Sequence, residues 1–514
     1  MKGEYTMKKK PILSLLLAAL LFIQTVSCSS GGTNEEKETQ ADNAAVEEAL
    51  TPAGQEEEEP EGNGRSDVKD SLPDDLDFGG ATLHFFTRGG DRDTQMEFQA
   101  EELNGEVVND AVYTRNLKAQ ERLNIAMDLI LANVNIHGGT NSAIQKAVHS
   151  GSGDYDLLGN GMYSMMSLTM ENILLPMNDL PYLDFTAPWY NHAFLDQTNF
   201  NGKNYTVMGE VGQTMISGAF VMFFNRTLLD TFYNGEVNIY QIVNEGEWTI
   251  DKMTSLCEPV YQDANGNGKA DEGDIFGHYF TNTDTLGADS FYGASRIEYL
   301  KKNDDGTWFF NAACERMITF TEKMHKLLFE GTNTLRLPYN NDDIFNTMKA
   351  DQTIFTTWML SGIDLLRDME SDFGIIPMPK FDTAQEKYAE YVHDASSSFS
   401  IPTTEQDPAM VAAFLEAMSA ESFRTVTPAY FETALKSKYS RDSETSQMLD
   451  IIVDGIYLDI GYIFGGSLNS PIGKIRGVLA NATSCENAAS SLAKNEKATM
   501  KSLEKLLQKY EEIG

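Results

Sequence analysis

Cysteine and histidine are scarce in this chain of 514 residues, which has four cysteines and seven scattered histidines. After Cys28, only Cys257, Cys314 and Cys485 remain, so at most one disulfide can form, and their spacing matches no metal motif. We expect buried free thiols, with a single disulfide as the alternative. The Gly-x-Ser-x-Gly elbow, the His-Glu-x-x-His motif, the P-loop and the Rossmann glycine fingerprint are also missing. The sequence therefore gives no sign of the enzyme classes that depend on these motifs.

Basic residues are few relative to acidic ones. The chain has 39 Lys and Arg against 77 Asp and Glu, a formal net charge of −38. Binding to nucleic acid or to an anionic lipid surface needs clustered positive charge, so we expect neither partner. With so many carboxylates, a chance pair of acids says little about glycosidase chemistry. The hydrophobic content of 41% is enough for a substantial core.

Long apolar runs are absent except near the start of the chain. Lysines in 7–10 precede an apolar run, Pro11 to Ile23, that is too short for a membrane span, and small residues lead to Cys28. This pattern is typical of a secretory signal peptide over 1–27, and it resembles the lipobox of bacterial lipoproteins. The resemblance implies that Cys28 is diacylated and anchors the protein to the extracytoplasmic face of the cell membrane. An ordinary signal peptide with a coincidental cysteine is the alternative.

The next segment, 28–75, is rich in Glu, Asp, Gly, Ser, Asn and Ala and contains four consecutive acids, Glu56 to Glu59. It has too few large apolar residues to form a core, so we predict a disordered acidic tether. The membrane would then be contacted only through the lipid anchor. Residues 76–514 are too long for one simple core, because a domain usually has roughly 100–200 residues.

Strand and helix patterns alternate at the start of this body. Apolar strands are predicted at 81–87, 124–131 and 154–159, with helices at 105–123 and 140–150 between them. This alternation predicts an α/β domain with a parallel sheet. Ligands of such sheets bind beyond the carboxyl ends of the strands, which places the turns after the first and third strands among the candidates.

Five further patterns occur in a fixed order along the chain. They are an apolar strand ending in Phe224-Asn225-Arg226, the helix start Trp248-Thr249, the run Ala350-Asp351-Gln352-Thr353-Ile354-Phe355 followed by Trp358, the segment from Asp372 to Pro379, and Phe399-Ser400-Ile401-Pro402 followed by a helix. No one of them is specific. The ordered set resembles the family 1 extracellular solute-binding proteins of ABC importers, the group that includes maltose-binding protein, over about 76–514.

The resemblance implies two hinged α/β lobes of the type II periplasmic-binding-protein kind, with the ligand cleft between them. The N-terminal lobe would be 76–214 plus 397–439, and the C-terminal lobe 215–396 plus 440–514. It also implies a monomeric, non-catalytic protein that delivers a small solute, an oligosaccharide by first choice, to an ABC permease. Two alternatives stay open: a secreted glycosidase that uses two carboxylates, and a surface sensor or adhesin without transport.

Candidate ligand contacts come from aromatic and polar residues near strand ends. Trp358 is the first candidate, because sugar-binding members of the family have a stacking tryptophan near this place; a core position is its alternative. The remaining candidates are Arg88, Asp91, Asn160 and Tyr163 on strand-end turns, Trp189 and Tyr190 as a gate over the cleft, and Asp394 near the return crossing between lobes. A solvated loop position is the alternative for the residues on turns and near the crossing, and plain packing is the alternative for the two gate residues.

One loop carries a cation-binding pattern. Asp263, Asn265, Asn267, Asp271 and Asp274 supply side-chain oxygens at loop positions 1, 3, 5, 9 and 12, and Lys269 offers its carbonyl at position 7. Gly268 stands at position 6, where the turn requires glycine. We predict a structural calcium site, with an ion-free Asx/Gly turn as the alternative.

Overall fold

The computed structural model describes residues 64–89, 96–132, 137–282, 285–338, 344–431, 435 and 443–513. All of them belong to one compact unit, Gly62–Gly514. Cys28 and Asp91, singled out in the sequence, lie outside the described residues. Within the described ranges, none of the helices combines the length and the apolar character that crossing a bilayer requires.

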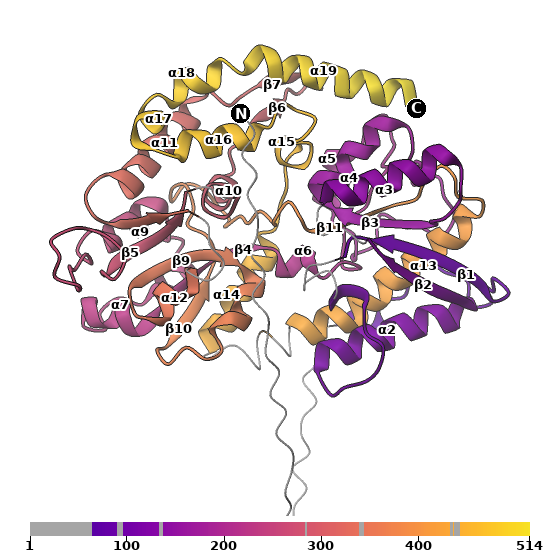
Figure 1. Ribbon diagram of the computed structural model, residues 1–514, viewed down its shortest axis with the longest axis horizontal. Coiled ribbons are helices and arrows are strands. Elements are labelled where there is room, and N and C mark those ends of the chain that lie inside the picture. The colour runs from indigo at the N-terminus through magenta and orange to yellow at the C-terminus, as the bar shows by residue number, and fades with distance from the viewer. Residues whose placement is uncertain are drawn as a thin grey trace, which may run out of the picture. The chain divides into compact units, whose positions relative to one another are not determined.

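The first sheet has four strands in the order β11-β3-β1-β2 (Figure 1). Its strands are β1 (Ala81–Thr87), β2 (Ile125–Leu131), β3 (Leu157–Gly161) and β11 (Ser397–Ser400). β1 is parallel to both β2 and β3, as the alternation of strands and helices predicted, whereas β11 is antiparallel to β3. The helical elements of this part are η1 (Arg65–Asp67), α2 (Val107–Leu123), α3 (His137–Ser150), α4 (Met162–Leu168), η2 (Thr169–Glu171), α5 (His192–Thr198), α13 (Pro408–Glu421) and η4 (Ser422–Val426).

The second sheet has five strands in the order β10-β4-β9-β5-β8. They are β4 (Phe220–Asn225), β5 (Phe276–Thr281), β8 (Thr334–Leu337), β9 (Thr353–Met359) and β10 (Phe373–Ile376). β4 is antiparallel to β9 and β10, while β5 is parallel to β8 and β9. A small hairpin, β6 (Leu300–Lys302) with β7 (Trp308–Phe310), lies apart from both sheets.

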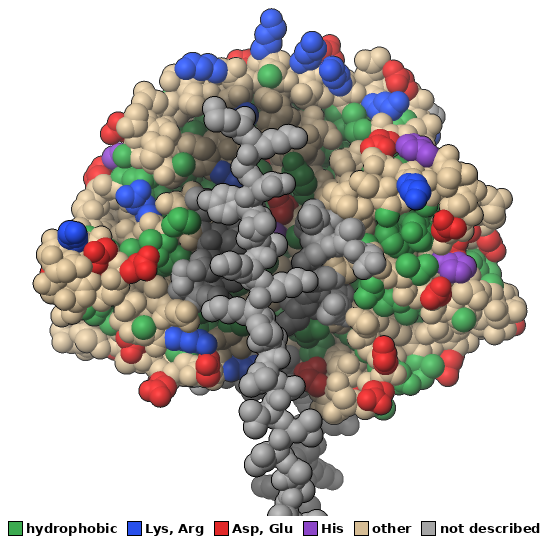
Figure 2. All heavy atoms as spheres, viewed as in Figure 1, with side chains coloured by type: hydrophobic (Ala, Val, Ile, Leu, Met, Phe, Trp, Pro, Cys, Tyr) green, Lys and Arg blue, Asp and Glu red, His purple; other side chains and the backbone are tan. Residues whose placement is uncertain are grey.

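The remaining helices follow the strands of the second sheet or close the chain. They are α6 (Thr214–Ser217), α7 (Arg226–Tyr233), α8 (Ile239–Asn244), α9 (Ile250–Cys257), α10 (Thr285–Ala294), α11 (Glu315–Phe329), α12 (Ile344–Lys349), η3 (Leu360–Leu366), α14 (Ser443–Asp454), α15 (Ile460–Ile463), α16 (Pro471–Leu479), α17 (Ala482–Glu486), α18 (Ala488–Ala493) and α19 (Glu496–Ile513). Figure 2 shows basic side chains gathered along the edge where Figure 1 places α19, whose lysines stand out in this acidic chain.

Side-chain caps mark the first turns of two helices, α9 and α13. Thr249 accepts a hydrogen bond from the Lys252 N–H at the start of α9, and Asp407 accepts one from the Met410 N–H at the start of α13, where Pro408 takes the first helical position. Each cap satisfies an N–H that has no partner within the helix. Local sequence therefore determines both helix starts.

The buried apolar side chains form two clusters. One lies between the first sheet, α2 and α13 and includes Phe85, Phe98 and Phe399. The larger cluster contains residues of both sheets. Cys257, Cys314 and Cys485 are free thiols, as expected, and burial raises the pKa of the Cys485 thiol to about 12.

Candidate ligand-binding site

Two chain segments run between the sheets and pair with each other. The first, 214–220, leads into β4, and the second, 391–397, leads into β11. We call them the crossing segments. The Phe220 N–H donates to the Tyr391 carbonyl at 2.9 Å, and the His393 N–H donates to the Gly218 carbonyl at 2.8 Å. These two segments pass between the sheets side by side, which is the arrangement of a hinge.

The crossing segments are fastened to the first sheet by the carboxylate of Glu97. One oxygen accepts from the N–H and the hydroxyl of Thr214, at 2.8 and 2.6 Å, and the other accepts from the hydroxyl of Ser397 at 2.6 Å. Burial raises the pKa of Glu97, and these bonds together with the charge of Arg88 oppose the rise. One buried carboxylate therefore holds both crossing segments where they meet the first sheet.

The first turn of α4 lies against the second crossing segment. The Met162 N–H donates to the Ser396 carbonyl at 2.8 Å, and the Tyr163 N–H donates to the Asp394 carbonyl at 3.0 Å. The Tyr163 side chain is 40% exposed and is the one aromatic residue, among those the structure describes, that ranks as exposed. It leaves an aromatic face at the junction that a solute can reach.

Two glycines after α15 complete the surroundings of this ring. A Cβ atom at Gly465 or at Gly466 would lie only 3.3 Å from atoms of the Tyr163 ring. A side chain at either position would therefore push the ring aside. The close approach explains why glycine is suited to both positions.

Charged groups lie on the other side of Asp394. Arg476 in α16 donates two parallel hydrogen bonds to Asp289 in α10, Nε to Oδ1 at 2.8 Å and Nη2 to Oδ2 at 2.6 Å, and its Nη2 is 3.7 Å from the Asp394 carboxylate. Burial lowers the pKa of Arg476, but the bond and charge of Asp289 outweigh burial and raise it overall. The Asp289 side chain is fully buried, whereas Arg476 is 31% and Asp394 20% exposed.

The buried side chain of Tyr462 in α15 borders these charged groups. Burial, with the charges of Asp289 and Asp394, raises the pKa of Tyr462 well above its ordinary value. Like an unperturbed tyrosine hydroxyl, it is protonated at neutral pH and can donate a hydrogen bond.

We call Tyr163, Asp394, Arg476 and Asp289 the junction cluster. Its parts come from α4, the second crossing segment, α16 and α10. The cluster combines an accessible aromatic ring, whose backbone N–H is bonded to the Asp394 carbonyl, with a planar guanidinium and a carboxylate, and this combination suits a ligand that has both a C–H face and hydroxyl groups. Contacts within the cluster hold its donors and acceptors in place, which makes it the candidate binding site.

The structure brings together only some of the predicted contacts. Tyr163 and Asp394 are joined at the junction cluster. Asn160 is fully buried in β3, where its Nδ2 donates to Asn141 Oδ1 at 2.7 Å and its Oδ1 accepts from the Gly161 N–H at 2.8 Å. Arg88 is 5% exposed, and its charge acts on Glu97. Asn160 and Arg88 therefore support the frame of the site and offer little surface to a solute.

Trp358 takes the core position that the sequence left as its alternative. Its side chain is 5% exposed, it pairs with Val221 across β9 and β4, and its ring meets the Phe345 ring edge-on with 5.6 Å between centroids. A ring enclosed in this way presents no face to a solute in this structure.

Trp189 and Tyr190 also lie in the core, packed with the cluster of the first sheet. The Tyr190 hydroxyl donates to Glu416 Oε2 in α13 at 2.6 Å, and the Trp189 ring packs against Phe423. Packing, the alternative to a gate over the cleft, is what this structure shows for both residues.

In the predicted calcium loop, the carboxylate oxygens accept hydrogen bonds from N–H groups of the loop itself. Asp263 accepts from the N–H groups of Gly266 and Gly268 at 2.7 and 2.9 Å, and Gly268 has the positive φ of 74° that the turn requires. Asp271 accepts from the side-chain amides of Asn265 and Asn267. Two further positions are bonded within the loop: Asp274 accepts from the Ala264 N–H, and the Lys269 carbonyl accepts from the Tyr261 hydroxyl.

Within the described residues, no three carboxylate, histidine or cysteine side chains surround a common point. To hold calcium, the loop would have to turn the oxygens of Asn265 and Asn267 inward in place of their amide nitrogens. The calcium site therefore stays a prediction.

Several residues of the site carry no local mark in the sequence. Arg476 and Asp289 are 187 positions apart, and Glu97 is 117 positions from Thr214 and 300 from Ser397. No short pattern identifies such pairs. The one available signal was the Gly465-Gly466 pair, since adjacent glycines often mark a close approach of the backbone to another group.

Comparisons with known proteins show the fold. No protein-family profile and no curated protein matches the sequence. Among solved structures, the galacto-N-biose-/lacto-N-biose I-binding protein of the ABC transporter from Bifidobacterium longum, in complex with lacto-N-biose, has a TM-score of 0.56 at 13% identity, over 83% of this chain and 98% of that one. A family 1 extracellular solute-binding protein from Bifidobacterium longum subsp. infantis has a TM-score of 0.51 at 14% identity, over 80% of this chain and 98% of that one.

A third similar structure is UgpB from Mycobacterium tuberculosis in complex with glycerophosphocholine, with a TM-score of 0.54 at 14% identity over 82% of this chain and 99% of that one. The chain thus has the two-lobe α/β fold of extracellular solute-binding proteins, as the ordered motifs implied. Because one similar structure contains lacto-N-biose and another glycerophosphocholine, the fold alone does not select the ligand.

Proposed function

We propose that this chain is a non-catalytic, extracytoplasmic solute-binding protein that captures an oligosaccharide and delivers it to an ABC permease. The observation that supports this most is the junction cluster, which lies beside two paired crossing segments in a two-lobe fold. Solute-binding proteins close two lobes around a ligand by hinge motion, so groups beside the crossing segments stay near the ligand in both states.

An oligosaccharide is the solute that fits the cluster best. The exposed ring of Tyr163 can pack against the C–H face of a sugar, and Arg476 and Asp394 can donate to and accept from its hydroxyls. A strongly anionic solute would meet Asp394 and Asp289 as well as Arg476, and it would approach a chain whose net charge is −38.

The test is a titration of the purified body, 64–514, with a panel of solutes by isothermal calorimetry. The panel holds maltotriose, lacto-N-biose, glycerophosphocholine and a tripeptide. We expect one sugar to bind saturably, and Tyr163→Ala to weaken it at least about tenfold, which is about 1.4 kcal/mol. Leu365→Ala, which truncates an exposed side chain on η3, is the matched control and is expected to bind normally.

Binding of glycerophosphocholine or the tripeptide without any sugar would contradict the carbohydrate assignment but keep the solute-binding one. New reducing ends after incubation with the bound sugar would support the glycosidase instead. The anchor is tested separately in cells: Cys28→Ala is expected to abolish incorporation of labelled palmitate and to release the protein from the membrane.

A further inference from the structure

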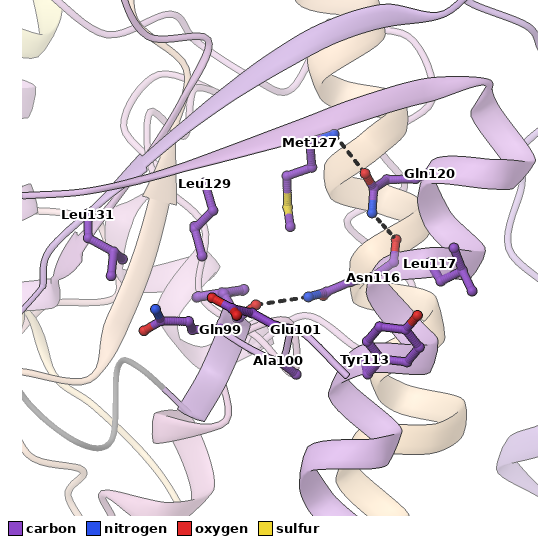
Figure 3. A pocket seen from close by; sticks show the side chains of 11 residues that line it. Gln99, Ala100, Glu101, Tyr113, Asn116, Leu117, Gln120, Met127, Leu129 and Leu131 are labelled. Atoms are coloured by element: carbon purple, nitrogen blue, oxygen red, sulfur yellow. Dashed lines mark hydrogen bonds between the residues drawn. The ribbon is translucent and has the colours of Figure 1, made fainter. Parts of the chain in front are cut away.

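A groove lies between β2 and α2, at the edge of the first sheet (Figure 3). It has a volume of about 260 Å³ and is lined by Met127, Leu129 and Leu131 of the strand and by Tyr113 and Leu117 of the helix. These side chains belong to neither the junction cluster nor the crossing segments. The floor of the groove is therefore an apolar strip along a sheet edge.

β2 is the last strand of its sheet, so one side of its backbone faces away from β1. The Ala132 N–H donates to the Thr87 carbonyl of β1, and backbone groups alternate in direction along a strand. The N–H groups of Met127, Leu129 and Leu131 therefore point outward. The first is satisfied by Gln120 Oε1 at 2.8 Å, as Figure 3 shows. For the other two, no hydrogen bond to a described residue is found.

The part of the chain that forms one side of this groove, 96–117, is rich in exposed apolar residues, and one of them, Leu117, lines the groove. Six large hydrophobic side chains are exposed in the described part of the chain, and four of them fall between positions 96 and 117: Met96, Leu103, Val107 and Leu117, each 38–61% exposed. An unpaired strand edge next to exposed apolar side chains is the usual setting for the addition of a strand from another chain.

The acidic residues around the groove indicate which charge a partner segment should carry. Glu101 lines the groove, and Glu102 follows it on the surface. Asp128 of β2 is exposed on the opposite face of the sheet. None of the three forms an ion pair with a described residue. A second copy of this acidic chain would bring like charges together at this edge, whereas a segment with Lys or Arg would neutralise them.

We propose that the β2 edge binds an extended segment of a partner protein in which apolar residues alternate with Lys or Arg. The segment adds a strand to the sheet through the N–H groups of Leu129 and Leu131. Its apolar side chains enter the groove beside Leu117, and its basic side chains lie on the opposite face beside Asp128.

The experiment uses the body of the protein, 64–514, and a fluorescent seven-residue peptide of alternating Lys and Val, the length of β2. Fluorescence anisotropy is expected to show saturable binding, and the matched peptide of alternating Glu and Val is expected not to bind. Leu117→Lys and Leu129→Lys are each expected to raise the Kd at least about tenfold. Leu117 is 41% exposed, so this substitution leaves the fold intact, and Leu365→Lys, at 44% exposure, is its control.

Strand pairing is tested with two N-methylated peptides that carry methyl groups on alternate amides, either those of the Lys or those of the Val residues. One edge of the peptide pairs with β2, so one isomer is expected to bind and the other to lose binding. Equal binding by both isomers, no binding of the Lys–Val peptide, or unchanged binding to Leu117→Lys and Leu129→Lys would overturn the proposal. So would concentration-dependent dimerisation in sedimentation velocity that Leu117→Lys abolishes, because the occupant would then be a second copy.

Discussion

Arg476 and Asp289 form a two-pronged ion pair between α16 and α10, with donor–acceptor distances of 2.8 and 2.6 Å. The carboxylate is fully buried, while the guanidinium is partly exposed and also lies near Asp394. Asp289 therefore fixes the orientation of the Arg476 guanidinium, whose Nη2 also lies near the Asp394 carboxylate. The pair links the stability of the second lobe to the shape of the candidate site.

Arg476→Ala is expected to lower both the stability of the fold and the affinity for the solute. Removing the cation breaks the two parallel hydrogen bonds to the buried Asp289 carboxylate, and removing one partner of a buried ion pair typically destabilises a protein by about 3–5 kcal/mol. Arg476→Lys keeps the charge but not the two parallel bonds, so it is expected to retain most stability and to weaken solute binding. Urea unfolding and calorimetric titration measure the two effects. Normal solute binding by Arg476→Lys would remove Arg476 from the site.

The second prediction concerns the fastening of the crossing segments by Glu97. Glu97→Ala removes the acceptor of three hydrogen bonds, from the Thr214 N–H, the Thr214 hydroxyl and the Ser397 hydroxyl. Each buried donor left without a partner costs about 1–3 kcal/mol. The variant is expected to unfold at markedly lower urea concentration. Glu258→Ala, which removes an exposed ion pair with Lys326, is the control and is expected to change little. Equal urea midpoints for Glu97→Ala and Glu258→Ala would contradict the role of Glu97.

Much of the fold follows from local sequence. The strand predicted at 81–87 is β1, the helix start predicted at Trp248-Thr249 is that of α9, and the helix expected after Pro402 is α13. Alternating apolar patterns and capping residues act over a few positions, so they can be recognised without the rest of the chain. The two-lobe fold was indicated by the resemblance of the ordered set of patterns to a known family, and not by any local pattern itself.

The site was harder to predict, because its contacts join distant parts of the chain. Trp358 ends an apolar strand whether its ring is exposed or buried, and what buries it here is Phe345 from α12. Tyr163 follows the end of β3, as expected, but its glycine partners Gly465 and Gly466 come from a much later part of the chain. Burial and long-range pairing depend on the tertiary structure, which strand and turn signals do not contain.

The third prediction is a pH dependence that arises from Glu416. Burial raises the pKa of this carboxyl from 4.5 to about 7, although the hydrogen bond from the Tyr190 hydroxyl opposes the rise. The folded state therefore binds this proton more tightly than the unfolded state, and the free energy of unfolding falls as pH rises from about 4.5 to about 7. Glu416→Gln removes that contribution. The difference between wild type and variant, measured by urea unfolding, is expected to change across this window and to be constant above it. A difference that does not vary with pH would show that Glu416 titrates normally.

The last prediction tests the calcium loop. If the loop binds calcium, adding the ion to chelator-treated protein raises the melting temperature in a dose-dependent way, because a ligand that binds only the folded state stabilises it. Asp263→Asn removes a carboxylate that caps the turn through Gly266 and Gly268, and it is expected to abolish the response. Asp304→Asn, in the turn between β6 and β7, is the matched surface control and is expected to respond like wild type. Mg²⁺ at the same concentration separates calcium binding from general screening of the acidic surface, since it prefers six ligands in a tighter shell. Equal shifts with both ions, or a shift that survives Asp263→Asn, would mean that the loop is an ion-free turn held by its own hydrogen bonds.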